Sequence, residues 1–110
     1  MWQRILVSVG LGKTLVGGLG NTASGGSTTV VGDDNNEAVT GAAVVSGGRN
    51  NLASGPYSAI SGGQGGIVQP SGRLASISGG WGNVASGVAA HVGGGQRNTA
   101  SGLAAICSPS

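Results

Sequence analysis

The sequence contains few of the residues that build most protein cores. Among its 110 residues are three aromatic side chains, no phenylalanine, and only 7% charged residues. An ordinary layered domain buries large aliphatic and aromatic side chains. Here the hydrophobic 38% is mostly alanine and valine, which bury little area each, and 25 glycines add to the entropy lost on folding. An irregular monomeric globule is therefore not expected, and the chain needs regular stacking, association, or both.

Cysteine, charged residues and long apolar segments are also scarce, and this limits the functions that can be expected. Cys107 is the only cysteine, so neither an intrachain disulfide nor a cysteine metal cluster is expected. The net charge of +2 comes from scattered groups, which does not favour nucleic-acid binding. No segment approaches the ~20 apolar residues of a membrane span. Residues 1–13 resemble the start of a signal peptide, but the apolar stretch is short and broken by glycines, so cleavage is not expected.

The remaining residues form a repeat. Glycines that close "ASG"-like triplets stand at Gly10, Gly25, Gly41, Gly55, Gly72, Gly87 and Gly102, with spacings of 15, 16, 14, 17, 15 and 15. Between them lies a Gly-Gly pair, replaced once by Gly32-Asp33. "GDDNNEAVTG" then has one extra residue, "GAAVVSGG" is one short, and "GGQGGIVQPSG" has two extra. Insertions confined to turns are typical of stacked repeats.

Three residue columns recur within the repeat. A small residue precedes a branched aliphatic residue by two positions, which is the alternation of a strand. The small column contains Thr28, Val44, Ser58, Ala75, Ala90 and Ala105; the aliphatic column contains Val30, Val45, Ile60, Ile77, Val92 and Cys107; the asparagine column contains Asn21, Asn51, Asn83 and Asn98. Each unit therefore predicts two short strands and no helix. Low-complexity disorder is the alternative, but a flexible Gly/Ser linker has no reason to keep an aliphatic column.

This pattern predicts an all-β fold, a parallel β-roll or β-solenoid with rungs of about 15 residues. The repeat domain spans residues 17–110, and residues 1–16 are a degenerate first rung or an N-terminal cap. Stacked asparagine amides are expected to bond to one another along the axis. Because one small rung encloses only a thin layer of alanine and valine, we expect several chains to place their Val/Ile columns against a shared axis.

The segments "SGGRNNLASGPYSAISGG", "SGGWGNVASGVAAHVGGG" and "GGGQRNTASGLAAI" resemble the head repeats of trimeric autotransporter adhesins, the YadA-like head. The resemblance covers residues 17–107 well. It implies a left-handed parallel β-roll, a homotrimer, a bacterial cell-surface location, and binding to host matrix proteins or other surfaces. The rungs here run longer than most in that family, and the sequence shows no neck, heptad stalk or membrane anchor. A structural spacer in a phage tail fibre or extracellular filament, or a single-chain β-solenoid such as an ice-binding protein, are the alternatives.

Candidate catalytic and metal-binding residues are few. "GLGKT" at 10–14 invites a phosphate-loop interpretation, but position 7 is valine where the motif needs glycine. His91 has no acid or nucleophile near it in sequence and is expected to face outward as a surface residue. Asp33, Asp34 and Glu37 lack a recognised calcium-loop spacing and are expected to form a solvated acidic turn. No enzyme activity, metal or cofactor is therefore predicted.

The exposed corners are the candidate binding residues. Arg49, Trp81, Gln96 and Arg97 occupy the two variable positions after the Gly-Gly pair, where a rigid ladder would present them to a ligand. Variable loop residues without a role are the alternative. Cys107 is expected to pack as a small hydrophobe, with an interchain disulfide as the alternative in a trimer. Only Thr28 and Thr29 hint at the regular threonine array of an ice-binding surface.

Overall fold

The computed structural model describes residues 12–107, which form a parallel β-solenoid without helices. Residues 1–11, with the signal-like segment and most of the "GLGKT" context, lie outside the described residues. The strands are β1 (Thr14–Val16), β2 (Thr22–Ala23), β3 (Thr29–Val31), β4 (Glu37–Ala38), β5 (Val44–Val45), β6 (Leu52–Ala53), β7 (Ala59–Ile60), β8 (Ile67–Val68), β9 (Ser76–Ile77), β10 (Val84–Ala85), β11 (His91–Val92), β12 (Thr99–Ala100) and β13 (Ile106–Cys107). One odd strand and the following even strand make one rung, so rung 1 contains β1 and β2, and rung 6 contains β11 and β12. The predicted fold class is confirmed.

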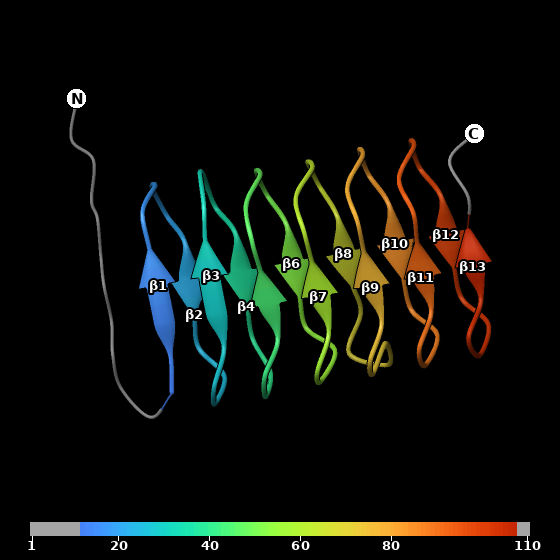
Figure 1. The fold of residues 1–110 in the computed structure, drawn as a ribbon, viewed down its shortest axis with the longest axis horizontal. Coiled ribbons are helices and arrows are strands. Elements are labelled where there is room, and N and C mark those ends of the chain that lie inside the picture. Colours follow the sequence, from blue (N-terminus) through green and yellow to red (C-terminus); the bar gives the residue numbers. More distant parts are fainter. Residues whose placement is uncertain (1–11, 108–110) are drawn as a thin grey trace.

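The odd strands form one parallel sheet and the even strands a second, each in chain order (Figure 1). Each strand pairs with the equivalent strand of the next rung, as β3 does with β5 through Thr29↔Val44 and Val30↔Val45. Loops at opposite edges of the two sheets connect them, in two rows that run along the stack. The strands have only two or three residues because the glycine-rich corners occupy most of each rung.

The strand register corrects the repeat lengths expected from the glycines. Outward residues of the odd strands pair as Thr14↔Thr29↔Val44↔Ala59↔Ser76↔His91↔Ile106, so every rung has 15 residues except the one with 17. The 17-residue rung contains the expected two-residue insertion, around Pro70 and Ser71. The extra and missing residues expected around Gly41 do not exist, because Thr40, not Gly41, is equivalent to Gly25. Consequently Ala43, fully buried, fills the small column, and Val44 faces outward.

The core is one thin layer between the two sheets. Odd strands contribute the larger side chains and even strands the smaller ones. The buried members are Leu15, Val30, Val45, Ile60, Ile77 and Val92 from the odd strands, and Ala38, Ala53, Val68, Ala85 and Ala100 from the even strands. Cys107 lies at the end of the aliphatic column, opposite Val92 in the ladder and partly buried. In most rungs a branched side chain from the odd strand lies with alanine from the even strand, and in rung 4 Ile60 lies with Val68; all of these side chains are buried.

The Val/Ile column does not face an axis between chains. Val30, Val45 and Ile60 have 0% exposure in a single chain, and Ile77 has 1%. The even-strand column lies against them, so that each chain closes its own core. Any association must therefore use an outer surface of the solenoid. The chain offers large ones, since its extents are 38 × 29 × 13 Å.

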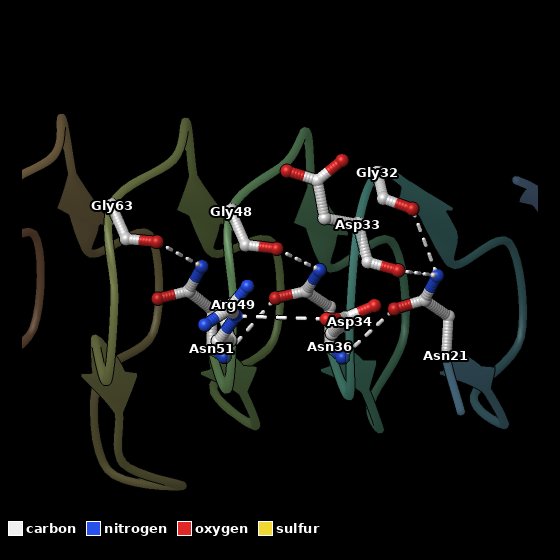
Figure 2. Close-up of polar contacts among 9 residues, drawn as sticks. All are labelled: Asn21, Gly32, Asp33, Asp34, Asn36, Gly48, Arg49, Asn51 and Gly63. Atoms are coloured by element: carbon white, nitrogen blue, oxygen red, sulfur yellow. Dashed lines mark hydrogen bonds and ion pairs between the residues drawn. The ribbon is translucent and has the colours of Figure 1, made fainter. Parts of the chain in front are cut away.

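An asparagine column lines the interior beside the Gly-Gly pairs (Figure 2). The amides do not bond to one another, as the sequence suggested, but link neighbouring rungs through the backbone. Asn51 Nδ2 donates to the carbonyl oxygens of Gly47 at 2.9 Å and Gly63 at 3.1 Å, and its Oδ1 accepts the Gly66 N–H at 2.8 Å. The sequence missed a fifth member of this column, the fully buried Asn36, because of the same glycine misalignment.

Candidate functional site

The corner that follows each Gly-Gly pair forms a ladder of its own, here called the Gly-Gly corner. Its first positions are Leu19, Asp34, Arg49, Gln64, Trp81 and Gln96, joined by parallel bridges from one rung to the next. Backbone bonds fix the register, with Trp81 N–H donating to the Gly95 oxygen at 2.9 Å and Arg97 N–H to the Trp81 oxygen at 2.8 Å. Side chains at these positions therefore stand in a row about 4.8 Å apart. Three of the four predicted ligand-contact residues, Trp81, Gln96 and Arg97, lie together in rungs 5 and 6, and Arg49 lies in rung 3.

Two pairs of side chains organise the surface of this corner. Arg49 Nε lies 3.6 Å from Asp34 Oδ2 across one rung, with the two side chains 59% and 36% exposed (Figure 2). Such an exposed ion pair contributes about 0–1 kcal/mol. The Arg97 guanidinium carbon lies 4.9 Å from the centroid of the Trp81 ring, a cation–π contact. Trp81 as a whole is 41% exposed, so its ring contacts Arg97 while remaining open to solvent.

Arg97 has an unusual backbone conformation for a long side chain. It occupies the second position of the corner, where every rung has a positive φ. The other rungs place glycine or asparagine there: Gly20, Asn35, Asn50, Gly65 and Gly82, while Arg97 has φ 54°. The left-handed region costs about 1–2 kcal/mol for a residue other than glycine or asparagine. The fold accepts this strain at the residue that covers Trp81, and it accepts the same conformation at the opposite corner, for example at Tyr57 and Leu74.

The opposite row of loops, here called the apolar corner, carries exposed hydrophobic side chains on rungs 3 to 6 and the turn after them. Tyr57 is 59% exposed, Leu74 54%, Val88 42% and Leu103 81%. Backbone bonds such as Leu74 N–H to the Pro56 oxygen, 2.9 Å, link one turn to the next. Tyr57 and Leu74 occupy one backbone position of this corner, and Val88 and Leu103 occupy the position before it, where the exposed Arg73 precedes Val88 in the ladder. Exposed hydrophobic residues gathered along one corner are typical of interaction surfaces.

Sequence reasoning did not single out Gln64 or the apolar corner. Gln64 shares the ladder position of Trp81 but was separated from it by the two-residue insertion. The hydrophobic residues of the apolar corner fall on two neighbouring positions of the turn, so no single sequence column contains Tyr57 and Leu74 together with Val88 and Leu103. An alignment on strand register, had it been known, would have found both sets.

One serine–histidine pair lies on the outer face of the odd sheet. Ser76 Oγ and His91 Nδ1 are 2.7 Å apart on neighbouring strands. A hydrolytic site would also need a third group to orient the imidazole. No Asp or Glu follows Glu37 in the sequence, and Glu37 lies in β4 of the other sheet. The pair is half-buried on a sheet surface, and its geometry adds nothing to the candidate binding site.

The remaining candidates from the sequence concern metal, phosphate and ice binding and the thiol of Cys107. Among residues 12–107 no group of three His, Cys, Asp or Glu side chains is arranged to hold a metal ion. Thr14 begins strand β1, whereas a phosphate loop needs a helix there. Thr28 is fully buried and Thr29 is followed by Val44 in the outward column, so no regular threonine array forms. Cys107 Sγ lies 3.1 Å from the Thr99 oxygen, and its thiol is free in the chain.

Comparisons with known proteins give no relative. No family model, curated protein or solved structure matches this chain. Within residues 12–107, no helix has the length and apolar character needed to cross a membrane. The resemblance to adhesin head repeats therefore rests on the repeat pattern and on the parallel β-solenoid, with which a β-roll is consistent.

Proposed function

We propose that this chain is a non-enzymatic surface-binding module, similar to the head of a trimeric autotransporter adhesin and located at a bacterial cell surface. The observation that carries the proposal is the rigid Gly-Gly corner, where Trp81, Gln96 and Arg97 are exposed on a ladder fixed by backbone bonds. Host matrix proteins or other extracellular surfaces are its partners. A flat ladder without a deep pocket binds such surfaces through several weak contacts at once.

The homotrimer is part of this proposal. The apolar corner is the strongest candidate for the contact between copies, because it exposes four hydrophobic side chains, Tyr57, Leu74, Val88 and Leu103, in one row of turns. If three apolar corners meet at one axis, the Gly-Gly corners at the opposite edges of the sheets point away from it. Each trimer then presents three identical binding rows, which raises the avidity for a repetitive surface.

The oligomeric state is tested by light scattering on the full chain. We expect the mass of a trimer for the unaltered protein and of a monomer for the double variant Val88→Lys/Leu103→Lys. Gln64→Lys on the Gly-Gly corner is the matched control and stays trimeric. A monomer for the unaltered chain, or a trimer for the double variant, would contradict this contact.

Binding is tested with latex beads that carry the chain. Beads are washed over glass coated with collagen, fibronectin or hyaluronan, and over bare glass. We expect retention on at least one coated surface, and loss of it with the monomeric double variant. A trimer whose beads are retained on none of these surfaces would instead favour the structural spacer of a fibre.

A further inference from the structure

The Gly-Gly corner has a distinct chemistry in rungs 4 to 6. Gln64, Trp81, Gln96 and Arg97, here called the Trp81 patch, are exposed on three consecutive rungs. The patch offers an aromatic face, two carboxamides that donate and accept hydrogen bonds, and one guanidinium. Its spacing follows the strand spacing of about 4.8 Å, so a ligand that contacts all four residues runs along the axis of the stack.

The charge around the patch has one sign. All three acidic residues lie at or before Glu37, so residues 38–110 contain Arg49, Arg73, Arg97 and His91 without a carboxylate side chain. The one ion pair among residues 12–107 joins Asp34 and Arg49, two rungs or more from Trp81. Arg97 is exposed, its guanidinium lies over the Trp81 ring, and it takes no part in that ion pair. A ligand of the patch is thus expected to supply the negative charge.

Among residues 12–107, Arg97 is the one residue at its corner position that is neither glycine nor asparagine. Glycine or asparagine meets the requirement for positive φ in every other rung, so the fold does not need arginine there. Positive φ also occurs at Tyr57 and Leu74 of the opposite corner, so the strain alone assigns no role. What distinguishes Arg97 is that its guanidinium carbon lies 4.9 Å from the centroid of the exposed Trp81 ring.

We propose that the Trp81 patch binds an acidic polysaccharide, a sugar chain with carboxylate or sulfate groups. The C–H face of one sugar ring packs on Trp81, the amides of Gln64 and Gln96 bond to hydroxyl groups, and Arg97 pairs with the acidic group of the same or the next sugar. This inference rests on the proposed surface-binding function and names its ligand class. An extended peptide is disfavoured, because the backbone groups that would pair with it are used inside the ladder.

The experiment measures the affinity of the full chain for immobilised polysaccharides by surface plasmon resonance. Hyaluronan carries carboxylates, chondroitin sulfate also carries sulfates, dextran is neutral, and polyglutamate is acidic without sugar. We expect binding to hyaluronan, chondroitin sulfate or both, at least about tenfold tighter than to dextran and polyglutamate, and weakening as salt is added. A preference for hyaluronan or for chondroitin sulfate shows whether the patch recognises the carboxylate or the sulfate group.

Two variants and two controls assign the binding to the patch. Trp81→Ala and Arg97→Asn are each expected to weaken binding about tenfold. Arg97→Asn leaves the melting temperature unchanged or raises it by up to about 5 °C, because it relieves the strain. Arg73→Gln removes the same charge at the apolar corner, away from the Trp81 patch, and Ala89→Gly relieves a positive φ at that corner. With the oligomeric state checked to be unchanged, both retain binding within about twofold.

The proposal is overturned if dextran or polyglutamate binds as tightly, if Arg73→Gln weakens binding as much as Arg97→Asn, or if no acidic polysaccharide binds. Bead retention on collagen without polysaccharide binding would leave the surface-binding function standing and remove this ligand. Polysaccharide binding by a chain that never forms a trimer would keep the ligand and remove the trimeric head.

Discussion

At the residue scale, the fold depends on glycines and asparagines whose partners lie in the neighbouring rung. Gly48 has φ 85°, and a Cβ added to it would overlap the backbone of Gly63 in the next rung. The sequence predicted this need for glycine, and the buried Val/Ile column, from recurrence alone. It did not predict Asn36, because the repeat was aligned on Gly41, whereas Thr40 is the residue equivalent to Gly25. Residue type alone cannot tell these two positions apart, since only the strand register does so.

Ser58 is the residue least suited to its place. It is 1% exposed and its hydroxyl oxygen has no hydrogen-bond partner in residues 12–107, whereas alanine fills the equivalent position in most rungs. Ser58→Ala is expected to raise the free energy of unfolding by about 1 kcal/mol, measured by urea denaturation. Ser54→Ala is the control: its hydroxyl donates to the Val68 oxygen at 2.8 Å, so its loss destabilises the chain. Equal effects from both changes would refute the argument.

Gly66 interrupts the asparagine column. Asn98 N–H donates to Asn83 Oδ1 at 2.8 Å, but the Asn83 N–H one rung earlier faces Gly66, which has no side chain to accept it. Gly66 does not have a positive φ, so asparagine fits its backbone.

Gly66→Asn should therefore raise stability by about 1 kcal/mol in thermal unfolding. Gly66→Ala adds the Cβ without the amide and should give no such gain. A melting temperature for the asparagine variant at or below that of the alanine variant would show that the column does not stabilise through these bonds.

At the scale of the strand and corner, the fold requires a nearly constant number of residues in each rung. Strands of two residues have little stability alone, and each is held by in-register neighbours above and below. The recurrence predicted two strands in each rung, which the structure has, but it placed Val44 in the small column, where Ala43 lies. The chemistry of the corners was harder to predict, because a corner is a surface where any side chain with a suitable backbone conformation is tolerated. The apolar corner in particular carries tyrosine, leucine and alanine at one backbone position.

The two-residue insertion offers a test at this scale. Deleting Pro70 and Ser71 should restore a 15-residue rung and change stability by less than about 1 kcal/mol, because the added length lies in an exposed loop. Deleting Thr40 and Gly41 from a rung of 15 should abolish cooperative unfolding, since the residues after the deletion lose their register. Circular dichroism during thermal unfolding separates the two outcomes. Similar damage from both deletions would mean that rung length is not what the stack requires.

At the scale of the whole molecule, stability is expected to be a sum of contacts between neighbouring rungs. The sequence predicted the stack but placed the Val/Ile column at an axis between chains, whereas the single chain buries it. Composition suggested that one rung could not enclose a core, and the pairing of valine and isoleucine with alanine shows how it does. Which outer surfaces meet in an assembly depends on the corner residues, whose neighbours only the register defines.

The central claim is that equivalent residues of successive repeats lie above one another. Double electron–electron resonance tests this claim by measuring distances between two spin labels. One label is placed at Leu19 and the other at one further Gly-Gly corner position, in a Cys107→Ala chain diluted with unlabelled protein. Partners at Gln64, Trp81 and Gln96 lie three, four and five rungs away, so we expect narrow distributions near about 14, 19 and 24 Å. Distances that do not increase by a constant step, or broad distributions for all three pairs, would contradict the stacked-rung account.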